Sequence, residues 1–243
     1  MADDEHAEAV TRIRSKLATA RRRRLRPFGA EAHGFDLGPP LPVAEVAAHE
    51  RRWGVRLPAA YRAFVTQVGH GGRGRFGGAG PFYGLYPLAD AAELALSFVD
   101  DPPADWLQRP SPLRPHQHEA PAVLRTAEAT DEDLTAWYGG LLGLGTQGCG
   151  IEMALLVSGA HSGRVAYLDP DDHSAHLTED ADFLAWYERW LDDVLGGGRG
   201  IVSAAGPRGD EPEPLLAAAG RPDRDPPRRN IARTLRGLRS FFR

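Results

Sequence analysis

The chain has 243 residues, of which 42% are hydrophobic, and its formal net charge is -4 at pH 7. This length fits one domain with appendages, and no apolar run approaches the roughly 18 residues that predict a membrane span. The acidic start lacks the basic and apolar regions of a secretory signal. Cys149 is the only cysteine, which excludes an internal disulfide. We therefore expect a cytoplasmic protein.

Charge is distributed unevenly along the chain. Residues 1–26 carry eight basic and four acidic side chains, residues 27–196 carry eleven and twenty-four, and residues 197–243 carry ten and five. The central segment therefore has a net charge of -13 and lies between two basic arms. Such segregation indicates either that the arms fold onto the acidic segment or that this segment binds a basic partner.

The first arm predicts an amphipathic helix over residues 5–26. Its apolar residues recur at spacings of three and four and form one stripe: Ala7, Val10, Ile13, Leu17 and Ala20. The basic run Arg21 to Arg24 suits the end of a helix, where cations complement the dipole. A nucleic-acid contact is less favoured, because the neighbouring acidic segment would repel phosphate.

Two short helices are predicted after a loop rich in glycine and proline. The first starts after Pro42, presents Val43, Val46, Ala47, Glu50 and Trp53 on one face, and ends at Gly54. The second starts at Pro58, presents Tyr61, Phe64, Val65 and Val68, and ends at Gly69. Seven glycines between Gly69 and Gly80 then predict a turning loop.

The middle of the chain has weaker signals. Residues 82–88 predict a short strand, and residues 90–98 predict a helix capped by Asp90. Six prolines in residues 100–121 indicate a loop.

The last third predicts a hairpin, a third strand and a helix. The strands are residues 153–157, 165–168 and 174–177, with a glycine-bearing turn between the first two. The helix has Thr178 or Asp180 as its cap and acidic residues in its first turn. Its apolar face holds Phe183, Tyr187, Trp190, Leu191 and Val194. Residues 197–228 have the composition of a linker.

A basic amphipathic helix is predicted after Asn230. Its stripe is Ile231, Leu235, Leu238 and Phe242. Such a helix suits a membrane surface, a partner groove or the acidic segment of the same chain, and we favour the last.

Three sequence patterns are candidates for chemical sites: the glycine motifs, the single cysteine and two clusters of possible metal ligands. Gly72-x-Gly74-x-x-Gly77 and Gly143-x-Gly145-x-x-Gly148 match a dinucleotide motif. The first follows a predicted helix and the second precedes a strand, so neither has the required strand-to-helix context. Cys149 has no histidine near it in sequence, and we expect a buried structural cysteine rather than a nucleophile.

Metal ligands are the third pattern. His116, His118 and Glu119 lie in a proline-rich loop without a second cluster, whereas Asp169, Asp171, Asp172, His173 and His176 surround a predicted turn. Aspartates in a turn commonly cap their own backbone, and this turn lacks the glycine and terminal glutamate of a calcium loop. We expect neither a metal nor a cofactor.

The sequence Glu50-x-x-Trp-Gly-Val-x-Leu-Pro-x-x-Tyr-Arg-x-Phe-Val65, followed by Gly69-x-Gly-Gly72, resembles the SUKH superfamily. Gly80 to Leu88, Gln147 to Gly150 and Phe183 to Leu191 are also similar to that family, so the resemblance covers about residues 28–195. Residues 73–78 look like an insertion in its glycine turn. The motif residues are Trp53, Gly54, Leu57, Pro58, Tyr61, Phe64, Gly72, Gly84, Gly148, Cys149 and Trp190.

The resemblance implies an α+β fold, with a mostly antiparallel sheet and flanking helices, and no catalytic residues. We place the SUKH-like domain at 27–196, between a basic helix at 1–26 and a linker and helix at 197–243. The superfamily includes a fungal regulator of cell-wall synthesis and bacterial immunity proteins.

Three functions follow as hypotheses. The first is an immunity-type protein that neutralises a basic toxin domain by binding it, through Glu152, Asp169, Asp171 and Asp172. The alternatives are a regulatory scaffold without a toxin partner and an enzyme that uses Cys149. We expect a protein partner and no nucleic acid.

Overall fold

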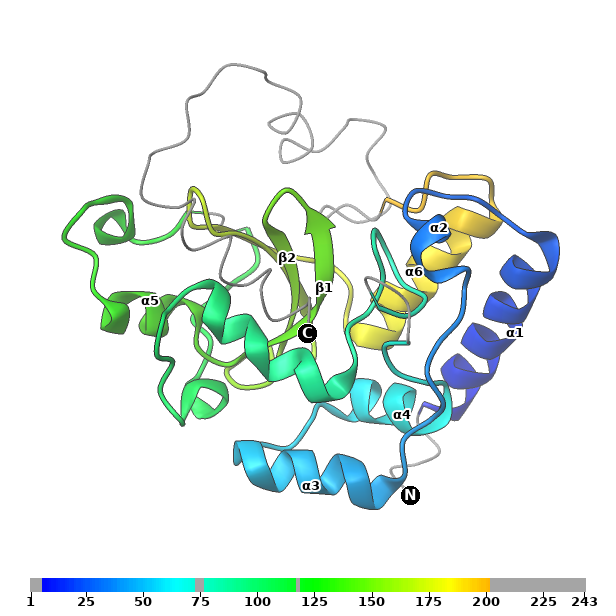
Figure 1. The fold of residues 1–243 in the computed structure, drawn as a ribbon, viewed down its shortest axis with the longest axis horizontal. Helices are drawn as coiled ribbons and strands as arrows, with labels where there is room; N and C mark the ends of the chain where they lie inside the picture. The colour runs from blue at the N-terminus through cyan, green and yellow to red at the C-terminus, as the bar shows by residue number, and fades with distance from the viewer. Residues whose placement is uncertain (1–5, 73–76, 117–118, 202–243) are drawn as a thin grey trace.

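A four-stranded antiparallel sheet lies at the centre of the fold, between two groups of helices (Figure 1). The computed structural model describes residues 6–72, 77–116 and 119–201. The helix predicted after Asn230 lies outside the described residues. The helices are α1 (Ala7–Arg23), α2 (Ala30–His33), α3 (Val43–Trp53), α4 (Ala59–Gln67), α5 (Asp131–Tyr138) and α6 (Phe183–Leu195), with the 3-10 helices η1 (Leu88–Ser97), η2 (Trp106–Gln108) and η3 (Ala122–Arg125).

The sheet is a meander in which each strand pairs with the next. Its strands are β1 (Leu141–Gly148), β2 (Ile151–Leu156), β3 (Val165–Asp169) and β4 (Ser174–Leu177), in the order β1-β2-β3-β4. Every pairing is antiparallel, which confirms the expected α+β class. The hairpin and third strand predicted from the sequence correspond to β2, β3 and β4.

Strand register decides which side chains share a face of the sheet, because residues paired across a ladder point the same way. Met153 pairs with Tyr167, and Glu152 pairs with Leu168, so these two pairs point to opposite faces. The Tyr167 face is covered by α6, whose Trp186 Nε1 donates to the Tyr167 hydroxyl at 2.9 Å. The 3-10 helix η1 packs against β1 (Figure 1). It covers the face of the sheet that carries Glu152, because a methyl group at Gly143, which would point to that face, would lie 3.0 Å from the Ala91 carbonyl oxygen of η1.

Helix α6 supplies the largest part of the aromatic core. Phe183, Trp186, Tyr187 and Trp190 have no exposed surface, and Phe183 packs against Tyr61 and Phe64 of α4 with ring centroids 4.8 and 5.0 Å apart. The predicted apolar face of this helix is therefore confirmed.

The predicted cap of α6 is wrong. Asp182 is the cap, and its carboxylate accepts from the Ala185 N–H at 2.9 Å. Thr178 is instead held in the sheet by a bond from its N–H to the Val165 carbonyl, and Asp180 pairs with Arg189. The first turn of α6 contains no acidic residue, because these acidic residues precede the helix.

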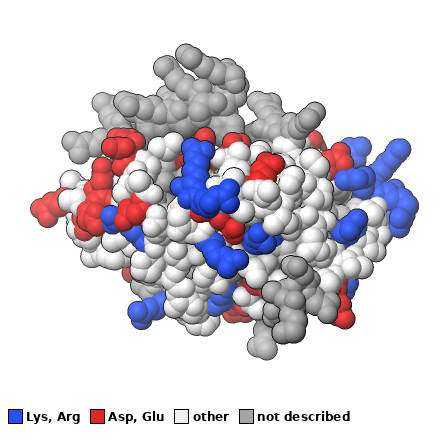
Figure 2. All heavy atoms as spheres, turned by 90° about the horizontal axis from the view of Figure 1, so that it is seen from below, with Lys and Arg blue, Asp and Glu red and all other residues white. Residues whose placement is uncertain are grey.

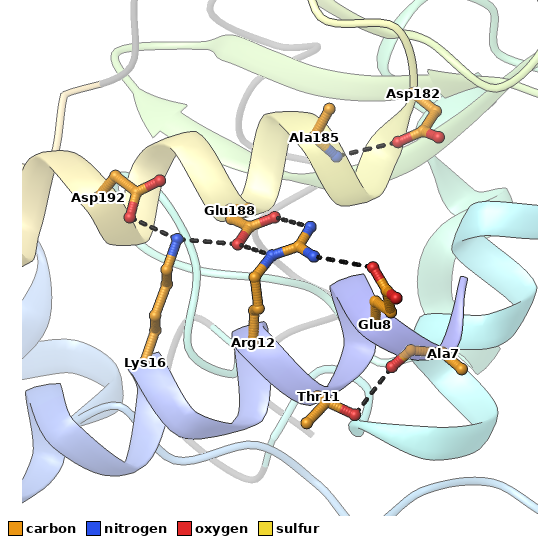
Figure 3. A network of polar contacts seen from close by, with 9 residues as sticks. All are labelled: Ala7, Glu8, Thr11, Arg12, Lys16, Asp182, Ala185, Glu188 and Asp192. Atoms are coloured by element: carbon orange, nitrogen blue, oxygen red, sulfur yellow. Dashed lines mark hydrogen bonds and ion pairs between the residues drawn. The ribbon is translucent and has the colours of Figure 1, made fainter. Parts of the chain in front are cut away.

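The N-terminal helix α1 packs against α6. Val10, Ile13, Leu17 and Ala20 are at most 7% exposed and belong to the same hydrophobic core as the sheet. Beside this seam, Arg12 and Lys16 both donate to the Glu188 carboxylate, and Lys16 also pairs with Asp192 (Figure 3). The basic N-terminal segment thus contacts acidic residues of α6.

Helices α3 and α4 form the hairpin that their proline and glycine residues predict. α3 ends at Gly54 and Pro58 caps the start of α4. The Glu50 side chain is 9% exposed and accepts from the Leu57 N–H at 3.0 Å, so this carboxylate ties the joint between the two helices. Three residues of the predicted faces differ, because Val43 is 58% exposed and Ala47 and Val68 are only partly buried.

Residues 82–98 differ from their prediction. The predicted strand is wrong, because Phe82 and Gly84 have φ values of 54° and 98° and turn the chain, leaving one bridge between Gly78 and Leu85. The predicted helix is a 3-10 helix that starts after Pro87, and the Asp90 side chain does not cap it.

Helix α5 and strand β1 had no counterpart in the sequence analysis, and neither had the short helices α2, η2 and η3. Helix α5 begins with a capping box, in which the Thr130 hydroxyl accepts from the Asp133 N–H and the Asp133 carboxylate accepts from the Thr130 N–H. Strand β1 contains all three glycines of the second glycine motif. That motif is part of a strand and does not merely precede one.

The packing of α1 gives a test of whether it is part of the domain. We expect Ile13→Ala to lower the free energy of unfolding by about 2–5 kcal/mol, because a fully buried isoleucine leaves a cavity. Arg14→Ala, at an exposed position of the same helix, is the control and should change it by less than about 0.5 kcal/mol. Chemical denaturation of the full chain measures both. Equal, small effects would show that α1 is not part of the core.

Candidate functional site

The strand register brings the four predicted partner-binding residues to one end of the sheet. Gly148 pairs with Ile151 across the β1–β2 turn, and Glu152 pairs with Leu168, next to Asp169 at the end of β3. Asp171 and Asp172 follow in the β3–β4 turn. We call residues 146–152 and 168–174 the turn end.

The aspartates of the β3–β4 turn bond to their own backbone. Asp169 Oδ1 accepts from the Asp171 N–H at 2.9 Å, and Asp172 Oδ1 accepts from the Ser174 N–H at 2.8 Å. The side chains of Asp171 and Asp172 are nevertheless exposed. Burial raises the pKa of Asp169, and the charges of Asp172 and Asp171 add to this rise, against the hydrogen bonds from the turn. The turn is thus closed by hydrogen bonds of its own side chains and exposes acidic residues.

Helix α5 reaches this turn through its last residue. The Tyr138 hydroxyl lies 3.0 Å from His173 Nδ1, and the Tyr138 ring stacks on Phe98 with centroids 3.8 Å apart. Burial raises the pKa of Tyr138, as do the nearby charges of Asp169 and Asp172. Tyr138 therefore joins the acidic turn to the aromatic packing below it.

Glu152 is, like Asp169, a partly buried acid of the turn end. Its Oε2 accepts from the Tyr86 hydroxyl at 3.3 Å, and across the ladder it faces Thr146. Burial raises the pKa of Glu152 to about 8, and the Tyr86 hydrogen bond only partly offsets this rise. The same burial, together with the Glu152 charge, raises the pKa of Tyr86.

Cys149 is not the buried cysteine that the sequence analysis expected. It is exposed and occupies the two-residue β1–β2 turn with Gly150, at φ values of 53° and 86°. Two successive positive φ values define a type I′ turn, which matches the twist of a β-hairpin. The geometry of this turn directs the Cys149 side chain toward solvent.

The glycines of β1 allow close contact with the loop before η1. A methyl group at Gly145 would overlap the Gly84 carbonyl oxygen, and one at Gly148 would lie 2.8 Å from the Tyr83 ring. The Tyr86 N–H also donates to the Leu144 carbonyl at 2.7 Å. The close approach of this loop to β1 therefore explains the spacing of the glycines, and no nucleotide-binding role is needed to account for it.

The remaining motif residues lie away from the turn end, in the helical part of the fold. Trp53, Leu57, Tyr61, Phe64 and Trp190 are buried, and Gly54 and Pro58 bound α3 and α4. Gly72 lies close to Gly38 and Gly78. These residues build the scaffold, whereas Gly148 and Cys149 lie in the turn end and Gly84 packs against Gly145 of β1.

Sequence reasoning missed Tyr86 and Tyr138. Both are tyrosines whose hydroxyl reaches a polar side chain of the turn end, and they lie 66 and 35 residues from their partners in sequence. Tyr86 is part of the strand predicted at residues 82–88, but no feature of the neighbouring residues indicates a contact with Glu152.

No group of three or more His, Cys, Asp or Glu side chains in the described ranges is arranged to hold a metal ion. Of the first predicted cluster, His118 lies outside the described residues. In the second, Asp169 and Asp172 are engaged by the turn itself. Within the described part of the chain there is also no helix of the length and apolar character that crossing a membrane requires.

The fold and the turn end define an α+β domain with an acidic tip and flanking aromatic helices. Residues 40–188 match the model of the SMI1 / KNR4 family (SUKH-1). The match covers more than half of the chain, and the protein belongs to this family. No curated protein and no solved structure gives a significant match to it. Helix α1 and the end of α6 lie outside the matched residues.

The raised pKa of Glu152 predicts a pH-dependent stability. The unfolded chain ionises this carboxyl near its ordinary value of 4.5, but the folded chain holds the proton up to about 8. Stability is therefore lost as pH rises, and between about pH 6.5 and 8 we expect the free energy of unfolding to fall by up to about 1.4 kcal/mol per pH unit.

Glu152→Gln should remove this slope, and Asp171→Asn, an exposed acid of the same end, should keep it. Chemical denaturation at several pH values between 6.5 and 8 measures the slope. Histidines such as His33 still titrate in the unfolded chain in this range, but they do so equally in both variants, so the difference between the two variants reports Glu152. A wild-type slope equal to that of Glu152→Gln would contradict the burial of this carboxyl.

The exposure of Cys149 predicts a reactive thiol. We expect an aromatic disulfide reagent to modify one thiol per folded chain, at a rate within about tenfold of that of the chain in denaturant, because accessibility controls the reaction. Absorbance of the released thiolate measures it, with Cys149→Ser as the blank. Protection of the thiol until unfolding would restore the buried assignment.

Proposed function

We propose that this protein is a non-enzymatic binding module of the immunity type, which neutralises a basic toxin domain by direct binding inside the producing cell. The family match supports a protein that acts through partners, since the resemblance implies immunity and regulatory proteins and no catalytic residues. The observation that carries the proposal is the acidic turn end: exposed aspartates on a turn that its own hydrogen bonds close.

The hydrogen bonds of the turn and its charge contribute in different ways. A turn that is already ordered loses little conformational entropy on binding, so more of its contact energy appears as affinity. Exposed carboxylates attract a basic partner over a distance of about 10 Å at ordinary salt concentrations and accelerate encounter.

The rest of the described surface supports an orientation for this encounter. In Figure 2, Asp and Glu side chains are densest at the end of the molecule that carries α5, and Lys and Arg are dense at the end that carries α1. Glu128, Asp131 and Glu132 are exposed near the start of α5, and Arg21 to Arg24 are exposed at the end of α1. A basic partner is attracted to the first end and repelled from the second.

The first experiment is expression of the chain with the products of the adjacent genes. An immunity protein should capture one of them directly and protect cells from it. If every neighbouring product is harmless and none binds, the proposal is wrong, and the regulatory scaffold becomes the better account.

Charge steering predicts the behaviour of variants of the turn. Asp171→Asn/Asp172→Asn should slow association with the captured toxin several-fold at low salt, and the difference should shrink above about 0.5 M salt because of screening. Asp100→Asn/Asp101→Asn, which neutralises an exposed pair outside the turn end, is the matched control. Stopped-flow or biosensor kinetics measures both, and equal slowing would place binding elsewhere.

A further inference from the structure

Among the described residues Glu152 has no cationic partner, whereas the buried carboxylates of Glu50 and Asp180 each pair with an arginine. Glu50 accepts from a backbone N–H and lies 3.3 Å from the Arg62 guanidinium. In contrast, Glu152 forms no ion pair within the described residues and has one hydrogen bond to a side chain, from the Tyr86 hydroxyl. A carboxylate offers about four acceptor positions, so most of its bonding capacity is unused.

The surroundings of Glu152 are partly open and suit a cationic group. Glu152, Tyr86 and Thr146 are all partly exposed as residues, whereas the raised pKa of the Glu152 carboxyl comes mainly from its burial. The Thr146 hydroxyl is directed by its bond to the Ile151 carbonyl at 2.9 Å, and the Tyr86 ring lies against Gly143 of β1. Next to Thr146, Gln147 is 5% exposed and its amide has no hydrogen-bond partner among the described residues.

A carboxylate beside a tyrosine hydroxyl is an arrangement that can bind guanidinium and ammonium groups. The carboxylate accepts their N–H bonds, and the hydroxyl oxygen, 3.3 Å from Glu152 Oε2, offers a further acceptor. The pairing gains strength where water is partly excluded. Asp171 and Asp172 at the same end would draw a cationic side chain toward this point without bonding to it there.

We propose that Glu152, Tyr86 and Thr146 form a recess that receives one arginine or lysine side chain of the protein partner. This inference rests on the proposed function for the identity of the partner, but the recess itself is a property of the free chain. Burial raises the pKa of Glu152 to about 8, so we expect entry of the cation at pH 7 to displace a proton from this carboxyl to solvent. One O–H bond breaks, one proton is released to buffer, and the carboxylate pairs with the cation.

The recess can be tested on the free chain with a small probe. N-acetyl-arginine amide is titrated into protein labelled with ¹³C at the glutamate carboxyls, and N-acetyl-citrulline amide, its uncharged analogue, is the control. We expect the arginine probe to shift the Glu152 resonance, assigned by its loss in Glu152→Gln, and to lower its apparent pKa. Tyr86→Phe should weaken the effect.

Two other resonances calibrate this experiment. Glu188, already paired with Arg12 and Lys16, should not respond, and exposed Glu128 reports non-specific attraction. A Glu152 response no larger than that of Glu128, or an equal response to citrulline, overturns the recess.

The toxin captured under the proposed function supplies the second test. Calorimetry in buffers of different ionisation enthalpy should show release of close to one proton at pH 7, and Glu152→Gln should abolish this release and weaken binding at least about tenfold. Unchanged affinity and proton count in that variant would overturn the inference while leaving the proposed function intact. If no toxin binds but the arginine probe does, the proposed function fails and the recess stands.

Discussion

The packing of α6 on the sheet is the interaction on which the rest of the structure depends. One face of this helix places four aromatic rings with no exposed surface between the sheet, α4 and α1. The buried bond from Trp186 to the Tyr167 hydroxyl fixes the helix on β3, and the Tyr187 hydroxyl donates to the Ala79 carbonyl, which holds the loop before η1. Aromatic side chains of this size dominate core energetics, so the sheet is held in place from one side by a single helix.

That arrangement has a consequence for the turn end. Helix α6 covers the Tyr167 face of the sheet, and η1 packs against β1. The exposed residues of the sheet therefore lie mainly in the turns that connect its strands. The loop held by Tyr187 continues through Tyr83 to Tyr86, which contact Gly148 and Glu152. The scaffold that the family motif encodes thus ends in the acidic surface for which we propose a partner.

Helix α1 shows how an addition to a family fold can become part of its core. It lies outside the residues that match the family, yet its apolar stripe is buried against α6. The carboxylate of Glu188 is shared by two cations of α1 (Figure 3), and these contacts lower its pKa, with Arg12 the main cause. The uneven charge of the chain is explained in part by this contact within the molecule.

The sequence by itself determined the elements whose signals are local. Periodicity and bounding prolines and glycines defined α1, α3, α4 and α6, and alternation with turn residues defined β2, β3 and β4. The elements it got wrong lack such signals: the chain at Phe82 and Gly84 turns because packing against β1 requires it, and β1 itself is rich in glycine, which has little strand propensity. Only the tertiary structure decided that α1 joins the core, that Cys149 is exposed, and that Glu152 meets Tyr86. The first and third depend on contacts between residues more than 60 positions apart in the sequence, and the second depends on the backbone angles of a single turn. The pattern of neighbouring residues does not indicate either.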